Sequence, residues 1–142
     1  MISDGLREEL GDFRNANTTK LAYIGDAVYE IYVRLRSAEM CGRHAGDMNK
    51  YSVHYVKAES QAAAAKKLAE WFYTGEELSL FKRARNRTNT SHPRGCTPAV
   101  YKLATGFEAV IGWLYIRNDI VRLEAVIDQA VEEIDKSETT GF

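Results

Sequence analysis

The sequence predicts an all-α protein of a single domain. Its 142 residues are the length of one ordinary domain, and 45% hydrophobic with 27% charged residues predicts a packed soluble core. Apolar residues recur at helical spacing through most of the chain. No segment shows the apolar–polar alternation that a half-buried strand would produce.

The composition excludes several classes of protein. With a net charge of −1, any nucleic-acid surface must be a local patch. The two cysteines, Cys41 and Cys96, are too few for a disulfide scaffold and favour a reducing compartment. The first twelve residues carry four acids and one arginine, unlike a signal peptide, and no apolar run approaches the ~18 residues of a membrane span. We therefore expect a cytoplasmic protein without membrane contact.

The first long helix follows a polar lead-in, residues 1–17, in which the pattern allows only a short helical turn around Leu6–Phe13. Asn17 or Thr18 can cap this helix, which is expected to end near Ser37. Its main apolar stripe consists of Leu21, Ile24, Val28, Ile31 and Leu35. The other side is also apolar, which predicts burial on more than one side and contact with a second subunit.

Two helical regions are expected next, after a glycine-containing connector at residues 41–46. The first spans about residues 47–72, with a break near Ser52–Tyr55. Thr74 is expected to cap the second, and Lys82, Arg83 and Arg85 lie near its end, where the helix dipole favours cations.

The clearest loop runs from Arg87 to Cys96. Thr97 and Pro98 then have the residue types of an N-cap and a first helical position. This helix is expected to reach Arg117, and a last amphipathic helix to run from Asn118-Asp119 to Ile134. Residues 136–142 are predicted to be a disordered tail.

Two carboxylates lie inside these apolar helices. Asp26 follows Gly25, and Glu108 is the only charge between Leu103 and Ile116. Burying a carboxylate is costly unless it is paired or binds a metal. Each is therefore partly exposed, neutralised by a base, or a ligand of a cation such as Mg²⁺, which takes one or two carboxylates with waters and phosphate oxygens.

The stretch from Leu78 to Phe107 contains no acid. It is either a solvated loop with cations at a helix end or a phosphate-contacting arm, and the length of the acid-free window favours the arm. Asn86, Asn89 and His92 are interleaved with its cations. The cations are Lys82, Arg83, Arg85, Arg87, Arg94 and Lys102.

Two Cys/His pairs, Cys41 with His44 and His92 with Cys96, have spacings that a zinc site could use. Without a paired-cysteine knuckle, incidental thiols and surface histidines are the simpler interpretation.

Two stretches resemble motifs of the ribonuclease III family. Residues 21–30, Leu-Ala-Tyr-Ile-Gly-Asp-Ala-Val-Tyr-Glu, resemble its signature helix. Residues 107–115, Phe-Glu-Ala-Val-Ile-Gly-Trp-Leu-Tyr, resemble its second catalytic helix. Residues 56–62 and 82–86 are similar to the Mini-III branch, a stand-alone catalytic domain. The resemblance covers residues 18–134.

The chain departs from the family pattern at two acidic positions. Classical members carry a glutamate where this chain has Ala22 and an aspartate where it has Thr105, and the Mini-III branch tolerates the loss of both. The departure bears on a second metal more than on the first. We expect no double-stranded-RNA-binding domain after the last predicted helix, so the loop at residues 82–96 is expected to supply much of the RNA contact.

The resemblance implies a Mg²⁺-dependent endoribonuclease for double-stranded RNA, acting on a stem of the 23S ribosomal RNA precursor. Asp26 and Glu108 would be the catalytic residues and the metal ligands, and Mn²⁺ could replace Mg²⁺. The expected RNA-binding residues are Lys82, Arg83, Arg85, Asn86, Arg87 and Arg94, with Lys57 and Gln61 as further candidates.

The resemblance also implies a ribonuclease III-like helix bundle, with residues 18–135 as the catalytic domain. It would form a homodimer with Tyr23 and Ala22 at the interface, and would act in the bacterial cytoplasm, where a ribosomal protein is a candidate helper.

Two other classes remain open from the sequence. A non-catalytic RNA-binding protein of the same fold would be consistent with the acids missing at Ala22 and Thr105. The other class is a helical protein-interaction module, against which the acid-free basic window argues.

Overall fold

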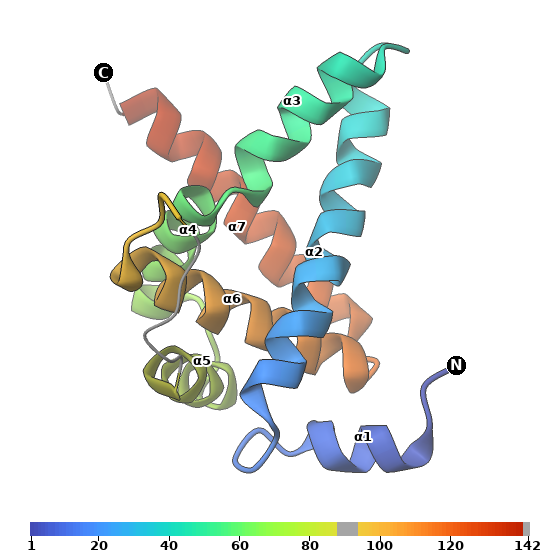
Figure 1. Cartoon of the computed structure of the whole chain (residues 1–142), viewed down its shortest axis with the longest axis vertical. Helices are drawn as coiled ribbons and strands as arrows, with labels where there is room; N and C mark the ends of the chain where they lie inside the picture. Colours follow the sequence, from blue (N-terminus) through green and yellow to red (C-terminus); the bar gives the residue numbers. More distant parts are fainter. Residues whose placement is uncertain (88–93, 141–142) are drawn as a thin grey trace.

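The computed structural model describes residues 1–87 and 94–140, with side chains up to residue 137, and its regular structure is entirely helical (Figure 1). This confirms the all-α prediction. None of the described helices is long and apolar enough to cross a bilayer. The helices are α1 Asp4–Gly11, α2 Thr18–Met40, α3 Ala45–Val56, α4 Ala58–Trp71, α5 Gly75–Arg87, α6 Pro98–Ile116 and α7 Ile120–Thr140.

Side-chain caps begin the helices where the sequence predicted them. The Asn17 side chain accepts a hydrogen bond from the Lys20 N–H at 3.1 Å, and Thr97 accepts one from the Val100 N–H at 3.2 Å. Thr74 accepts from the Glu77 N–H while the Glu77 carboxylate accepts from the Thr74 N–H, which is a capping box.

Three predicted helix boundaries were wrong. The first long helix continues past Ser37 to Met40. The break in the second region lies at Lys57, whose backbone is extended, and not near Ser52–Tyr55. The last helix continues past Ile134 to Thr140, so residues 136–140 are helical, and Lys136 forms ion pairs with Glu132 and Glu133 in its final turns.

The N-terminal segment, predicted to be a polar lead-in, is part of the core. Leu10 of α1 is fully buried, and the Trp113 indole N–H donates to the carbonyl of Gly11 at 2.7 Å. Arg7 donates to the carbonyl of Ile116 at 2.7 Å. Helix α1 therefore belongs to the folded domain. It supplies hydrogen-bond partners for the buried indole N–H of Trp113 and for the carbonyl of Ile116 at the end of α6.

Helix α6 crosses the middle of the bundle and packs against α1, α2, α4, α5 and α7 (Figure 1). Because neighbours lie on several sides, its residues are buried almost all round, from Ala104 to Ile116. This explains why the helix has a single charge, Glu108, between Leu103 and Ile116.

Helix α2 buries only part of the predicted stripe, together with residues from its other apolar side. Leu21, Val28, Tyr29 and Val33 are buried, but Ile31 and Leu35 of the predicted stripe are 59% and 60% exposed. The face that α2 turns to α6 also contains small and polar residues, so apolar periodicity alone did not identify it.

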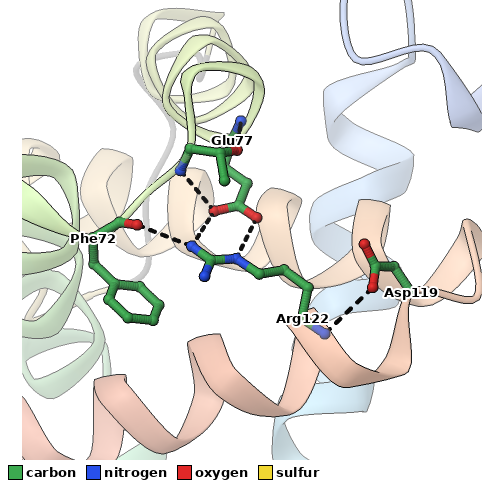
Figure 2. Close-up of polar contacts among 5 residues, drawn as sticks. Phe72, Glu77, Asp119 and Arg122 are labelled. Carbon is green, nitrogen blue, oxygen red and sulfur yellow. Dashed lines mark hydrogen bonds and ion pairs between the residues drawn. The ribbon is translucent and has the colours of Figure 1, made fainter.

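A buried ion pair joins the start of α5 to α7 (Figure 2). Glu77 is 2% exposed, and its carboxylate accepts two hydrogen bonds of 2.8 Å from the Arg122 guanidinium. Arg122 also donates to the Phe72 carbonyl at 2.9 Å and lies 4.4 Å from the centre of the Phe72 ring. A buried carboxylate requires such a set of partners, and here they connect α4, α5 and α7.

Helices α2 and α6 touch through their backbones at two glycines. A Cβ atom at Gly25 would overlap the carbonyl oxygen of Glu108 and lie 2.8 Å from the Gly112 nitrogen. A Cβ at Gly112 would overlap the carbonyl of Leu21. The absence of a side chain at these two positions therefore permits the close approach of the two backbones.

We expect Gly25→Ala to destabilise the protein by about 1–3 kcal/mol or more, because the added methyl meets backbone atoms that cannot rotate away. The free energy of unfolding in urea measures this. Gly75→Ala in α5 is the matched control, since a Cβ there has no atom within 4 Å. A Gly25→Ala protein as stable as the Gly75→Ala control would contradict the interpretation.

Candidate active site

The crossing of α2 and α6 brings Asp26 and Glu108 together. Asp26 follows Gly25, and Gly25 lies against the backbone of Glu108 itself. The two carboxyl groups are joined by a hydrogen bond. Two acids that are distant in the sequence therefore share one position.

This pair lies in the wall of a cavity of about 430 Å³. Residues of α2, α5 and α6 line the cavity, so three separate stretches of the chain converge there. Its lining residues are Thr18, Thr19, Ala22, Tyr23, Asp26, Ala84, Arg87, Tyr101, Thr105 and Glu108.

The two carboxyl groups have different environments. Asp26 is exposed and Glu108 is mostly buried. Burial is the largest cause that raises the pKa of the Glu108 carboxyl, and the hydrogen bond and negative charge of Asp26 raise it in the same direction. An interaction with Gln61 lowers it, and the net pKa is about 9. At neutral pH and without a cation, the Glu108 carboxyl therefore keeps its proton.

The donor set of the pair fits a hard divalent cation. Two carboxylates are what Mg²⁺ takes from a protein when waters and substrate phosphates complete its shell. Removal of the Glu108 proton would leave a negative charge beside Asp26, and a divalent cation would neutralise it. No soft sulfur or imidazole ligand lines the described cavity.

The two positions that lack the family's acids also line this cavity. Ala22 leaves space beside Asp26, and Thr105 turns its hydroxyl to the Tyr101 carbonyl at 2.9 Å. The departures seen in the sequence therefore fall within the site itself.

A second cavity of about 420 Å³ adjoins the first, because Thr18, Thr19 and Arg87 line both. Its other lining residues are Asn15 and Asn17, in the connection between α1 and α2. Arg87 was predicted from the sequence as a site residue, whereas Thr19 and Tyr101 were not. Each stands seven positions before one of the carboxylates, so helical spacing could have placed both on the carboxylate face.

Two of the expected RNA-binding arginines have partners within the protein. Arg83 donates to the Phe13 carbonyl at 2.7 Å, and burial followed by the charge of Arg87 lowers its pKa. Arg85 lies 5.6 Å from the centre of the Phe81 ring and donates to Asn86 at 3.2 Å.

The other expected RNA-binding residues divide by exposure. Lys57, Lys82, Asn86 and Arg94 are exposed. Gln61 is only 3% exposed, which sets it apart from these exposed candidates. Asn89 and His92 lie outside the described residues.

The two expected interface residues also differ. Tyr23 is 83% exposed, whereas Ala22 is 8% exposed within the single chain. The exposure of Tyr23 leaves its ring free for a partner, and Ala22 contributes to the cavity instead.

The zinc pairs find no support in the described part of the chain. Residues 1–87 and 94–137 contain no group of three or more metal-ligating side chains. The Cys41 thiol lies 4.0 Å from the Ser37 hydroxyl and 3.9 Å from the Asp47 carbonyl.

The chain is similar to proteins of one family. The family model described as Ribonuclease III domain matches residues 19–119. The Mini-ribonuclease 3 of Thermoanaerobacter sp. (strain X514) is 34% identical, over 82% of this chain and 81% of that relative. The Mini-ribonuclease 3 of Symbiobacterium thermophilum is 36% identical, over 83% and 90%. An X-ray structure of a protein from Fusobacterium nucleatum superposes with a TM-score of 0.74 at 30% identity, over 85% and 96%.

The raised pKa of Glu108 predicts a pH-dependent stability. The unfolded chain loses this proton near the ordinary value of 4.5, and the folded chain keeps it to about 9. Between these values the folded state binds more protons, so its contribution to the free energy of unfolding falls as the pH rises.

Urea titrations in chelator across this pH range measure the effect. Glu108→Gln should remove this part of the slope, whereas Glu132→Gln, which alters an exposed acid of α7, should retain it. An unchanged slope in Glu108→Gln would contradict the assignment.

Proposed function

The chain belongs to the ribonuclease III family and is an endoribonuclease, and from this premise we propose that it cleaves double-stranded RNA, aided by Mg²⁺, at the Asp26–Glu108 pair. The observation that carries the proposal is the meeting of these two carboxyls in the wall of a cavity.

Asp26 and Glu108 would hold the cation, and Mn²⁺ is expected to substitute for it. When bound, such a cation supplies a water of lowered pKa and positive charge beside the phosphate. Glu108 must give up its proton before it can act as a ligand, and Asp26, which is exposed, gives the pair its access to solvent. The products would carry 5′-phosphate and 3′-hydroxyl ends.

The second cavity supports binding of a duplex. A-form RNA is recognised mainly through phosphates and 2′-hydroxyls, for which cations, amides and hydroxyls are suitable partners. Arg87 is exposed and lines both cavities, and Asn15, Asn17 and Thr19 lie beside it. A backbone passing the carboxylates would therefore meet these groups next.

We propose a homodimer formed through the exposed face of α2. Tyr23, Ala27, Ile31 and Leu35 are exposed on this helix, and such an apolar face favours association in water. Sedimentation equilibrium measures the mass directly, and a monomer at micromolar concentration would contradict the dimer.

The proposed substrate is a stem of the 23S ribosomal RNA precursor, with a ribosomal protein as a candidate helper, both following from the similarity to Mini-ribonuclease 3 proteins. Incubating that precursor with the protein and mapping the new 5′ ends tests this. Cleavage of an unrelated duplex at the same rate would contradict a preference for the precursor.

Asp26→Asn and Glu108→Gln should each abolish cleavage of duplex RNA, with losses well beyond the roughly 10–100-fold typical of losing a ligand's outer partner. Initial rates in Mg²⁺ measure this, and Glu132→Gln is the control. Both variants should stay folded, because each replaces a carboxyl with an amide of the same size. Cleavage by either variant at the wild-type rate would refute the site.

Arg87→Ala should weaken binding of duplex RNA and make its salt dependence shallower by about one phosphate contact, without loss of stability. Lys66→Ala, an exposed cation of α4 that lines neither cavity, removes the same charge and should leave both unchanged. Equal affinities of the two variants would count against Arg87 as a phosphate contact.

A further inference from the structure

The feature that the site leaves unexplained is Gln61, a polar side chain that is 3% exposed on α4. Burying an amide is unfavourable unless its hydrogen bonds are made. Its neighbours on α4, such as Ala62, Ala64 and Ala65, are small and apolar, so an apolar side chain would suit the surroundings. The contacts of the amide therefore have to account for its presence.

One contact fixes the orientation of the amide. The Gln61 Nε2 group donates to the carbonyl of Val56 at 2.8 Å. A carbonyl only accepts hydrogen bonds, so Nε2, and not Oε1, must face Val56. Val56 is the last residue of α3, and its carbonyl is one of those that a helix end leaves without a partner. Gln61 thus links α4 to the end of α3 by a hydrogen bond, and the connection between these two helices is called the α3–α4 joint below.

The other contact reaches the active site. The Gln61 side chain lies beside the Glu108 carboxyl and lowers its pKa, as a hydrogen-bond donor does, against the larger effect of burial. The Nε2 group carries two hydrogens and can serve Val56 and Glu108 together. Glu108 lines the cavity and Gln61 does not, so the amide holds the carboxyl from the side of the protein interior.

The amide oxygen is left without a partner among the described residues. Gln61 Oε1 is buried and accepts no hydrogen bond. An unsatisfied buried acceptor costs about 1–3 kcal/mol. Because a methionine of similar length would avoid this cost, the donor side of the amide must provide what an apolar side chain cannot.

We propose that Gln61 is a positioning residue, which holds the Glu108 carboxylate in the orientation that binds the divalent cation. The inference rests on the proposed function. A glutamate side chain has several rotatable bonds, and Ala22 and Thr105 provide no further carboxylate to share the binding of the cation. Glu108 is therefore anchored to the α3–α4 joint through one amide.

The test compares two variants that loosen the same joint. Gln61→Met keeps the volume but removes both donated hydrogen bonds. Ser60→Ala removes the hydrogen bond of 2.6 Å from Ser60 to the His54 carbonyl, which also ties α4 to the end of α3. Ser60 therefore serves as a matched control for the joint.

Mn²⁺ binding to the RNA-free protein, followed by electron paramagnetic resonance, is the main readout. Gln61→Met should bind Mn²⁺ about 10-fold more weakly, the lower end of the range for losing a ligand's outer partner. Its affinity for duplex RNA in chelator should equal that of the wild type, and excess Mn²⁺ should recover part of the lost rate. Ser60→Ala should retain wild-type Mn²⁺ affinity.

Gln61→Asn provides a second variant if Gln61→Met does not fold. It keeps an amide but is too short to span from Val56 to Glu108, so it should also weaken Mn²⁺ binding. Wild-type Mn²⁺ affinity in the folded Gln61 variants, or an equal loss in Ser60→Ala, would overturn the inference. A wild-type protein that neither binds Mn²⁺ nor cleaves duplex RNA would instead overturn the proposed function.

Discussion

The backbone contact between α2 and α6 at Gly25 and Gly112 is the constraint on which the rest of the structure depends. Helices ordinarily pack about 8–10 Å apart, as the side chains between them require. Here neither helix has a Cβ at the contact, and a Cβ on either would overlap a carbonyl of the other. Asp26 follows one glycine, and Glu108 supplies the carbonyl that the glycine touches. Backbone packing thus brings the two carboxyl-bearing residues together, whatever rotamers their side chains adopt.

Two adjacent carboxylates, one of them buried, destabilise the folded state when both are charged. The raised pKa of Glu108 is the consequence of this unfavourable interaction. The remainder of the bundle supplies the stability. Helix α6 is buried almost all round, and the Glu77–Arg122 pair joins α5 to α7 through two hydrogen bonds of 2.8 Å. Glu108, the buried member of the pair, therefore lies on the helix that is packed on the most sides, where its position is least free to change.

Local features of the sequence were predictable because local chemistry determines them. Asn17, Thr74 and Thr97 cap helices as expected, since a cap involves neighbours in sequence. Asp26 and Glu108 were identifiable from the sequence because burying a carboxylate in an apolar helix costs free energy unless it is paired or binds a metal. The exposure of Ile31 and Leu35, the docking of α1 and the burial of Gln61 were not predictable, because each depends on contacts with distant segments. Apolar spacing on α2 identified only part of the buried face, because the backbone contact with α6 is made at Gly25, and glycine carries no hydrophobic side chain.

The composition of the acid-free stretch from Leu78 to Phe107 also could not distinguish cations that stabilise the fold from cations that face the cavities. Arg83 and Arg87 stand four residues apart on α5 and so share one side of the helix. Arg83 donates to the Phe13 carbonyl and holds the connection between α1 and α2 against α5. That connection carries Asn15 and Asn17, which line the second cavity with Arg87. One arginine therefore fixes part of the wall of a groove to which the other supplies charge. The same division applies to the carboxylates, where Asp26 faces solvent and Glu108 is held from behind. In both cases a buried hydrogen bond to a main-chain carbonyl, from Arg83 or from Gln61, fixes the position of a group that faces the cavity.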